Sequence, residues 1–305
     1  MPDPRYESAF FLAQKSNLNS LFAGIVPFWS RTGNCRILTP LKIKELSENT
    51  MADSFPILEY DPTPEAIIEP KRLLKPLAGM PEHGVICFFQ DVIDHFLAEG
   101  QLTLLKNLRS EMGHHPVYAF NHGNQSVALF QPGMGAPFAA VLLDEVIALG
   151  CRKFIACGGA GVLDQDIALG HLLIPTRAIR DEGTSYHYLP PAREVAAHPA
   201  AVTAIETVLQ QHQIDYLLTK TWTTDAIFRE TQPKVARRRA EGCLAVEMEA
   251  AALFAIAQFR GVRLGQILYG GDNLAGEVWD SRGWQKHWTV REKLVALAAE
   301  ACLLL

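Results

Sequence analysis

Apolar runs of strand length alternate with helix-forming segments along most of this chain, and this alternation restricts the folds open to it. The run at 125–135 ends in a glycine turn and is followed by an amphipathic segment at 136–150, which Gly150 closes. Strands that alternate with helices of this length form a mainly parallel sheet with helices on both faces. We therefore predict a three-layer α/β/α fold around a central mixed, mainly parallel sheet. The expected strands lie at 83–89, 125–135, 152–161, 170–183, 216–228 and 263–273, and the expected helices at 92–112, 136–150, 200–213, 246–261 and 291–305.

The first fifty residues differ from the rest of the chain. They show no sustained periodicity, and Asp3 and Glu7 beside a broken apolar run make a poor signal peptide. At Met51 the chain changes to a strand-like run followed by a proline-rich turn. Two interpretations stay open: 1–50 is a poorly ordered or wrongly assigned leader before a natural start at Met51, or it is a genuine extension. The predicted domain is 51–305.

Composition argues against several functional classes. With 28 basic and 33 acidic residues, the net charge of −5 argues against binding to nucleic acid through phosphate contacts. The apolar runs are shorter than the roughly 18 to 20 residues of a membrane span. Six scattered cysteines without a Cys-x-x-Cys pair suggest reduced thiols in a cytoplasmic protein. We expect no metal site, because no zinc pattern occurs and the adjacent pair His114-His115 has the wrong spacing for a helical metal face.

Four predicted strand ends carry residues that a strand end does not need. In open α/β sheets ligands bind at the carboxyl ends of strands, so these segments form the expected site. The glycines in two of them allow backbone amides to approach a ligand, although tight turns between strand and helix explain them equally well. The segments are Gly133-Met134-Gly135, Gly158-Gly159-Ala160-Gly161, Glu247-Met248-Glu249 and Gly270-Gly271-Asp272-Asn273.

Acidic side chains at two of these ends are candidate ligand contacts. Glu247 and Glu249 bracket Met248 just before an apolar helix. Carboxylates accept hydrogen bonds from vicinal hydroxyls and methionine supplies an adaptable apolar wall, so this combination suits a ribose. Either glutamate alone is also a favourable residue at a helix start. Asp272 is a candidate proton donor if burial raises its pKa, or else a cap of the next turn.

Taken in this order, these segments resemble the nucleoside phosphorylase family, which includes uridine phosphorylase, purine nucleoside phosphorylase and the methylthioadenosine nucleosidases. The resemblance covers about residues 55–305, and the stretch RDEGTSYHYLPP is most similar to the uridine phosphorylase branch. The segments that carry it are QPGMGAPFAAVLLDEVIALG, GGAGVLDQDIALGHLLIPTRAIRDEGTSYHY, TTDAIF, VEMEAAALFAIA and GGDN.

The resemblance implies cleavage of the N-glycosidic bond of a nucleoside in catabolism or salvage. Inorganic phosphate is the implied co-substrate, and no other cofactor is expected. It implies that Met248 and Glu249 hold the ribose, with Glu249 on the 2′- and 3′-hydroxyls and Glu247 assisting or shaping the loop. Ile227 and Phe228 match positions that pack on the base, and the amides around Gly133, Gly135, Gly158 and Gly159 are expected to face the substrate.

Base preference stays open in the resemblance. Asp272 matches the acid of the purine branch, which protonates or hydrogen-bonds the base, whereas the uridine branch generally lacks it. Arg229 and Gln232 lie just beyond the base-packing positions and are candidate partners for the carbonyls of a pyrimidine ring. Whether the sugar is ribose or deoxyribose is equally open.

The chain departs from the family at the phosphate site. The family's Gly-Asp-Pro-x-Arg turn matches EYDPTPEA only in Asp61-Pro62, with Pro64 in the place of the arginine. Ala156 and Gly159 stand where the family has an arginine and a hydroxyl residue. Arginine is the usual bidentate partner of phosphate oxygens, and a dianion in a dry pocket without a cation is costly.

Other cations are therefore required if phosphate binds, and the candidates are Arg180, His114, His115 or a residue of a neighbouring subunit. Three functions stay open: a phosphorylase with a rearranged phosphate site, a nucleosidase that uses water with Glu65 as its base, and a nucleoside-binding relative without activity. The resemblance also implies a homo-oligomer, based on dimers and extending to a hexamer in some members.

Overall fold

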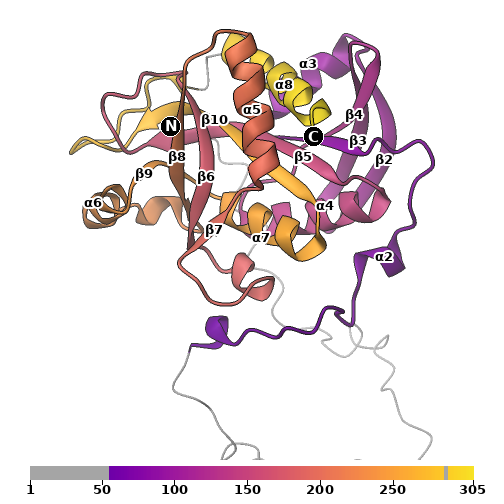
Figure 1. Ribbon diagram of the computed structural model, residues 1–305, viewed down its shortest axis with the longest axis horizontal. Coiled ribbons are helices and arrows are strands. Elements are labelled where there is room, and N and C mark those ends of the chain that lie inside the picture. The colour runs from indigo at the N-terminus through magenta and orange to yellow at the C-terminus, as the bar shows by residue number, and fades with distance from the viewer. Residues whose placement is uncertain (1–54, 285–287) are drawn as a thin grey trace, which may run out of the picture. The chain divides into compact units, whose positions relative to one another are not determined.

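The computed structural model describes residues 55–284 and 288–305, and Figure 1 shows the arrangement of their elements. The predicted break at Met51 and the segment 1–50 lie outside these residues. The strands are β1 (His83–Cys87), β2 (Leu102–Ser110), β3 (Gly113–His122), β4 (Gln125–Phe130), β5 (Lys153–Val162), β6 (Leu172–Asp181), β7 (Glu194–Ala196), β8 (Tyr216–Thr224), β9 (Cys243–Glu247) and β10 (Arg263–Asn273). The helices are α2 (Pro70–Leu73), α3 (Gln90–Ala98), α4 (Ala136–Leu149), α5 (Pro199–Gln211), α6 (Gln232–Ala240), α7 (Ala250–Arg260) and α8 (Trp288–Leu303), with 3-10 turns η2 (Pro56–Leu58), η3 (Thr184–His187) and η4 (Ile227–Arg229).

The described strands form one mixed sheet in the order β10-β6-β8-β9-β5-β1-β4-β3-β2, with β7 paired to β6. Parallel pairings join β4, β1, β5 and β10, and separately β6, β8 and β9. Because β10 pairs with both β5 and β6, and β5 also pairs with β9, five strands close into a ring. The predicted α/β fold with a mixed sheet is confirmed.

Helices cover both faces of the sheet, as the alternating pattern predicts. Helices α3, α5 and α8 pack on one face, and α4 and α7 pack on the other (Figure 1). Residues 250–257 of α7 are all buried, which explains why this helix is apolar on every side. Helix α4 begins after Gly135 (φ 89°) and ends at Gly150 (φ 134°), two conformations that favour glycine.

The prediction of one helix at 92–112 is wrong. The segment divides into helix α3 and strand β2, which forms a hairpin with β3. Gly100 (φ 71°) ends the helical stretch, and the residues after it pair with β3 instead. Strands β3 and β7 and helix α6 were not predicted. The strand end predicted at Glu247 is the end of β9.

The cysteines and the helix lengths of the described chain agree with the predictions made from composition. Cys87, Cys151, Cys157, Cys243 and Cys302 are free and buried. None of the helices in the described part of the chain is long and apolar enough to cross a membrane.

Candidate active site

A cavity of about 400 Å³ lies where the carboxyl ends of the parallel strands meet. It is lined by the turn after β1, the glycine turn after β4, the glycines 158–161, the β9–α7 turn, the end of β10 and the first turn of α8. Residues 158–161 do not form the predicted turn but belong to strand β5. The predicted strand ends therefore converge on one cavity. Its lining includes Phe88, Phe89, Gly133, Met134, Gly158, Gly159, Ile227, Glu230, Glu247, Met248, Glu249, Gln266, Asp272, Trp284 and Arg291.

The carboxylate of Glu247 holds the β9–α7 turn together and has no oxygen left for a ligand. One carboxylate oxygen accepts hydrogen bonds from the hydroxyls of Thr223 (2.6 Å) and Thr221 (3.3 Å). The other accepts from the backbone N–H groups of Glu249 (2.7 Å) and Ala250 (2.6 Å), at the start of α7. Because both oxygens are engaged, Glu247 caps the helix and fixes the β9–α7 turn. Of its two predicted roles, the structure supports the shaping of the loop.

Glu249 links this turn to the first glycine loop. Its Oε1 accepts a hydrogen bond of 2.6 Å from the backbone N–H of Gly135, 114 residues away in sequence. Burial, with a further contribution from Glu247, raises the pKa of Glu249 to about 8. Glu249 is 6 % exposed and lines the cavity, with the Gly135 N–H on Oε1 and the Met248 N–H close to its carboxyl group. The second oxygen can therefore accept from a ligand in the cavity.

A pair of carboxyl groups lies at another part of the cavity. Asp272, at the end of β10, accepts a hydrogen bond of 2.6 Å at Oδ2 from the indole N–H of Trp279. Glu230, which follows η4, lines the same cavity. Burial, with the nearby charge of Asp272, raises the pKa of Glu230 to about 7.

The residues predicted to contact the base are only partly brought together. Ile227 lines the cavity, but Phe228 is 95 % exposed and is not part of the lining. Arg229 is exposed, and the amide of Gln232 donates to the carbonyl of Gly276 (2.6 Å). In the 3-10 turn η4, successive side chains point in different directions, so neighbours in sequence do not share one wall.

Glycine is needed at position 133, and the side chain beside Gly158 of β5 leaves little room there. A Cβ at Gly133 (φ 81°) would lie 2.0 Å from the ring of Phe138. A Cβ at Gly158 would lie 3.2 Å from Phe88. The backbone at both glycines can thus pack tightly against these rings, and both glycines line the cavity.

None of the predicted phosphate cations lines this cavity. Arg180 is buried elsewhere and donates to Ser185 Oγ (2.8 Å) and to the carbonyls of Leu189 and Pro190. His115 bonds to Ser110 and packs edge-on against Phe138, and His114 is exposed on the same β2–β3 hairpin. Arg180 is therefore a structural residue of the segment around η3.

Arg291 is the one cation among the described residues that lines the cavity. It lies in the first turn of α8, where its guanidinium packs over the ring of Phe89 (4.7 Å to the centroid) and pairs with Asp91. Its Nε is buried and has no hydrogen-bond partner within residues 55–284 and 288–305. The side chain is 11 % exposed, so its charge is held in a largely dry environment.

Gln266 lies beside the position where the family's arginine is missing. It pairs in parallel register with Ala156 and is 1 % exposed. Its Oε1 is buried without a hydrogen-bond partner in the described chain, and the residue lines the cavity. Ala156 itself is buried in the core beneath α4 and α7. A buried amide oxygen of this kind needs a donor from water or a ligand.

The segment around Asp61 does not belong to this cavity. Asp61, Pro64 and Glu65 line a second, larger cavity of about 910 Å³. Glu65 pairs with Lys71 and Arg72, so its proposed role as a base is not supported by its position. The turn that follows β1 in the small cavity is Phe88-Phe89.

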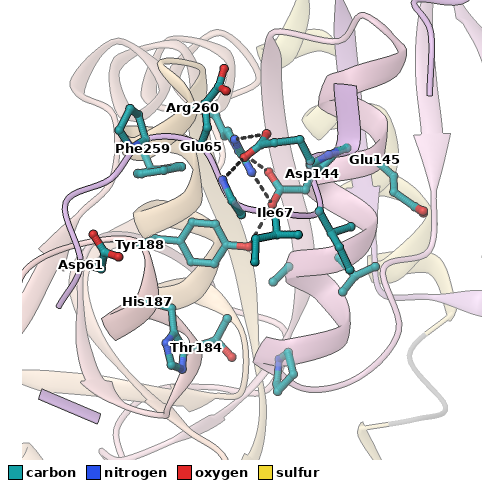
Figure 2. A pocket seen from close by; sticks show the side chains of 18 of the residues that line it. Asp61, Glu65, Ile67, Asp144, Glu145, Thr184, His187, Tyr188, Phe259 and Arg260 are labelled. Atoms are coloured by element: carbon teal, nitrogen blue, oxygen red, sulfur yellow. Dashed lines mark hydrogen bonds and ion pairs between the residues drawn. The ribbon is translucent and has the colours of Figure 1, made fainter. Parts of the chain in front are cut away.

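The larger cavity is a weaker candidate for chemistry, because its buried charges satisfy one another. Figure 2 shows Arg260, Asp144 and Tyr188 together at its centre. Arg260 donates to Asp144 (2.7 Å) and to Glu69 (3.3 Å), and the Tyr188 hydroxyl donates to Asp144 (2.9 Å). Exposed side chains such as Ile67 form other parts of its wall. This network ties α2, α4 and α7 together.

Three important cavity residues were missed from the sequence: Glu230, Gln266 and Arg291. Gln266 could have been found from the sequence, because it is a polar residue inside the otherwise apolar run LGQILYGG, and buried strands seldom carry one. Glu230 lies between Arg229 and Gln232, the two predicted contacts of the base, and belongs to no pattern of its own. Arg291 resembles any charged residue at a helix start.

Comparison with known proteins agrees with this architecture. The family model described as the phosphorylase superfamily matches residues 82–305. Over 209 residues the chain is 30 % identical to the uridine phosphorylase of Treponema pallidum, covering 64 % of this chain and 80 % of that protein. Over 159 residues it is 29 % identical to the guanosine phosphorylase of Halorubrum lacusprofundi, covering 50 % of this chain and 64 % of that protein.

Solved structures show the same fold. The uridine phosphorylase of Vibrio fischeri superimposes with a TM-score of 0.64 at 22 % identity, covering 78 % of this chain and 98 % of that one. The AMP nucleosidase of Bacteroides thetaiotaomicron superimposes with a TM-score of 0.60 at 22 % identity, covering 74 % of this chain and 88 % of that one. By its sequence match along residues 82–305 and by its fold, the chain belongs to the phosphorylase superfamily.

Proposed function

We propose that this protein cleaves the N-glycosidic bond of a nucleoside by phosphorolysis, releasing the free base and (deoxy)ribose 1-phosphate. The observation that carries the proposal is the convergence of Glu249, Met248 and Asp272 with both glycine segments on one cavity of about 400 Å³. Relatives that act as uridine and guanosine phosphorylases support the reaction class.

The sugar is proposed to lie against the β9–α7 turn. Glu249 accepts hydrogen bonds from the ribose hydroxyls through the oxygen that Gly135 does not use, and Met248 packs against the sugar ring. Such cleavage passes through a transition state with oxocarbenium character, so acceptor oxygens near the sugar stabilise its developing positive charge. Glu247 holds the turn in place through its four accepted hydrogen bonds.

Phosphate is proposed to bind at Arg291. This guanidinium is oriented by Asp91 and Phe89, so little side-chain freedom remains to be lost when an anion binds. Arginine donors fit phosphate oxygens, and a poorly solvated site strengthens the attraction. We propose Arg291 as the replacement for the arginines that the chain lacks at the family's positions.

Hydrolysis is the second candidate, and Gln266 is the observation that favours it. The unpartnered Oε1 of Gln266 lies next to Ala156, where a neutral residue has replaced a cation. Such an acceptor can hold a water molecule in the place of a phosphate oxygen. In this alternative the products are the free base and free sugar.

Base release from a panel of nucleosides tests the proposal. The purified full chain would be given uridine, thymidine, inosine, guanosine, adenosine and methylthioadenosine, each with and without inorganic phosphate. We expect release only with phosphate, and Arg291→Met should raise the KM for phosphate far more than that for the nucleoside. Release without phosphate would establish hydrolysis, and binding without release would show an inactive relative.

We also propose that the protein assembles as a homo-oligomer. Large apolar side chains are exposed beside the cavity, with Met134 at 77 % and Phe228 at 95 % exposure. Side chains of this kind commonly mark contact surfaces. Light scattering coupled to size-exclusion chromatography checks this, and a monomer at micromolar concentration would contradict it.

A further inference from the structure

Glu230 occupies an unusual position for a carboxyl group. It follows η4 directly, lines the small cavity and is half-buried. Within the described chain its carboxyl group forms no hydrogen bond, and its surroundings act on it only through burial and nearby charges. A carboxylate left without donors in such a place is costly, so the neutral acid is the favoured form.

Asp272 in the same cavity differs from Glu230 because its carboxyl group has a hydrogen-bond donor. Its Oδ2 already accepts the indole N–H of Trp279 at 2.6 Å, so this oxygen acts as an acceptor. Two carboxyl groups that share a poorly solvated cavity do not both ionise easily, and one of them keeps a proton. No donor of the described chain reaches the carboxyl of Glu230, so the charged form of Glu230 is the less stabilised of the two and the proton stays there.

We infer that Glu230, rather than Asp272, is the acid that gives its proton to the departing base. The inference rests on the proposed cleavage of a nucleoside in this cavity. Asp272 is then a positioning residue, which keeps the proton on Glu230 by its own charge and is itself held by Trp279.

The charges around Glu230 agree with this division. Burial comes first among the causes that raise its pKa to about 7, Asp272 comes second, and Lys234 of α6 opposes them. The remaining ionisable residues of the cavity lining are Glu247, Glu249 and Arg291, and the exposed Arg229 precedes Glu230 in the chain. An acid of this kind is still protonated near neutral pH and can transfer its proton in the transition state.

In a purine nucleoside the C1′–N9 bond breaks and its electron pair passes to the base. The proton of Glu230 goes to a ring nitrogen of the base, so the base leaves neutral and Glu230 becomes a carboxylate. An oxygen of HPO4²⁻ then forms the new bond to C1′, and the proton that the phosphate loses returns through water to Glu230. Bases with a basic ring nitrogen, namely purines, are therefore the class that gains most from this residue.

The test compares Glu230→Gln with Asp272→Asn, using the exposed Glu277→Gln as the control. The measurement is kcat/KM for inosine against pH at constant phosphate dianion. For the wild type we expect a fall in rate above about pH 7. Glu230→Gln should lower the rate by about 10²- to 10⁴-fold and remove this limb, since the loss of a positioned acid has this size. Asp272→Asn should keep the limb but move it to lower pH, because a like charge is lost.

A second readout does not need activity. In the unliganded protein, the part of the infrared carbonyl stretch that titrates near pH 7 should be lost in Glu230→Gln and unchanged in Glu277→Gln, while the part that titrates near pH 8, from Glu249, stays in both. If Asp272→Asn removes the pH limb or the infrared band while Glu230→Gln keeps it, Asp272 is the acid and the inference is wrong. A wild-type protein that shows the band but releases no base would instead overturn the proposed function.

Discussion

At the scale of single residues, the two glutamates around Met248 have different tasks although they lie two positions apart. Glu247 is saturated by four donors of its own fold, whereas Glu249 keeps one oxygen for the cavity. The sequence predicts a binding role for the pair, since two carboxylates around a methionine just before an apolar helix suit the hydroxyls of a sugar. It cannot divide their roles, because the threonines that engage Glu247 lie on β8, far away in the chain.

Glu249→Ala should lower kcat/KM for nucleosides by about 10²-fold, mainly through weaker sugar binding. The reason is the loss of hydrogen bonds to a carboxylate, which are worth about 1.5–3 kcal/mol each. Steady-state kinetics measures this, with Glu145→Ala as the control because Glu145 lines the other cavity. Near-normal turnover in Glu249→Ala would show that the ribose lies elsewhere.

Glu247→Gln should lower the free energy of unfolding by about 2–3 kcal/mol while the side-chain volume is kept. Its amide NH₂ cannot accept, so the donors on one side lose their partner, and an unsatisfied buried donor costs about 1–3 kcal/mol. Urea unfolding at an unchanged slope measures the loss. A midpoint equal to that of the exposed control Glu277→Gln would mean that the turn does not depend on this carboxylate.

At the scale of elements, the strands and helices of the ring could largely be predicted, because buried strands and amphipathic helices leave a periodic record. The hairpin β2–β3 could not, since its half-buried strands resemble a continuation of α3. The site was predictable where a strand end carries glycines or carboxylates. Arg291 and Glu230 were not, because only tertiary contacts bring them to the cavity.

Gly133→Ala should destabilise the first glycine loop and reduce activity. Gly133 has φ 81°, and a Cβ would stand 2.0 Å from Phe138, so both the backbone and the ring must shift. Backbone strain of this kind costs about 1–3 kcal/mol. Gly123→Ala is the matched control, because Gly123 also has positive φ (59°) but no atom within 4 Å of a Cβ. Equal effects of the two changes on thermal unfolding would contradict the close packing at the loop.

At the scale of the whole molecule, the buried carboxyl groups of the cavity make the stability of the folded protein depend on pH. Burial raises the pKa of Glu249 to about 8, so the folded state keeps a proton that the unfolded chain releases above its usual value of 4.5. The resulting stability is fully present below about pH 4.5 and is lost as the pH rises toward 8. Histidines with lowered pKa values, such as His83 and His198, act in the opposite direction.

The melting temperature should therefore fall less between about pH 5 and 8 in Glu249→Gln than in the wild type. The comparison isolates Glu249, because the histidines contribute equally to both proteins. Differential scanning calorimetry of the unliganded proteins makes the measurement. Parallel curves for the two proteins would show that Glu249 ionises normally in the folded state.

The origin of the new oxygen on the sugar tests phosphorolysis most directly. The full chain would cleave a nucleoside from the panel in ¹⁸O-labelled water with unlabelled phosphate, and the sugar product would be examined by mass spectrometry. The account predicts (deoxy)ribose 1-phosphate without ¹⁸O, since the oxygen on C1′ comes from phosphate. Free sugar that carries ¹⁸O would contradict it and would assign the cavity beside Gln266 to water.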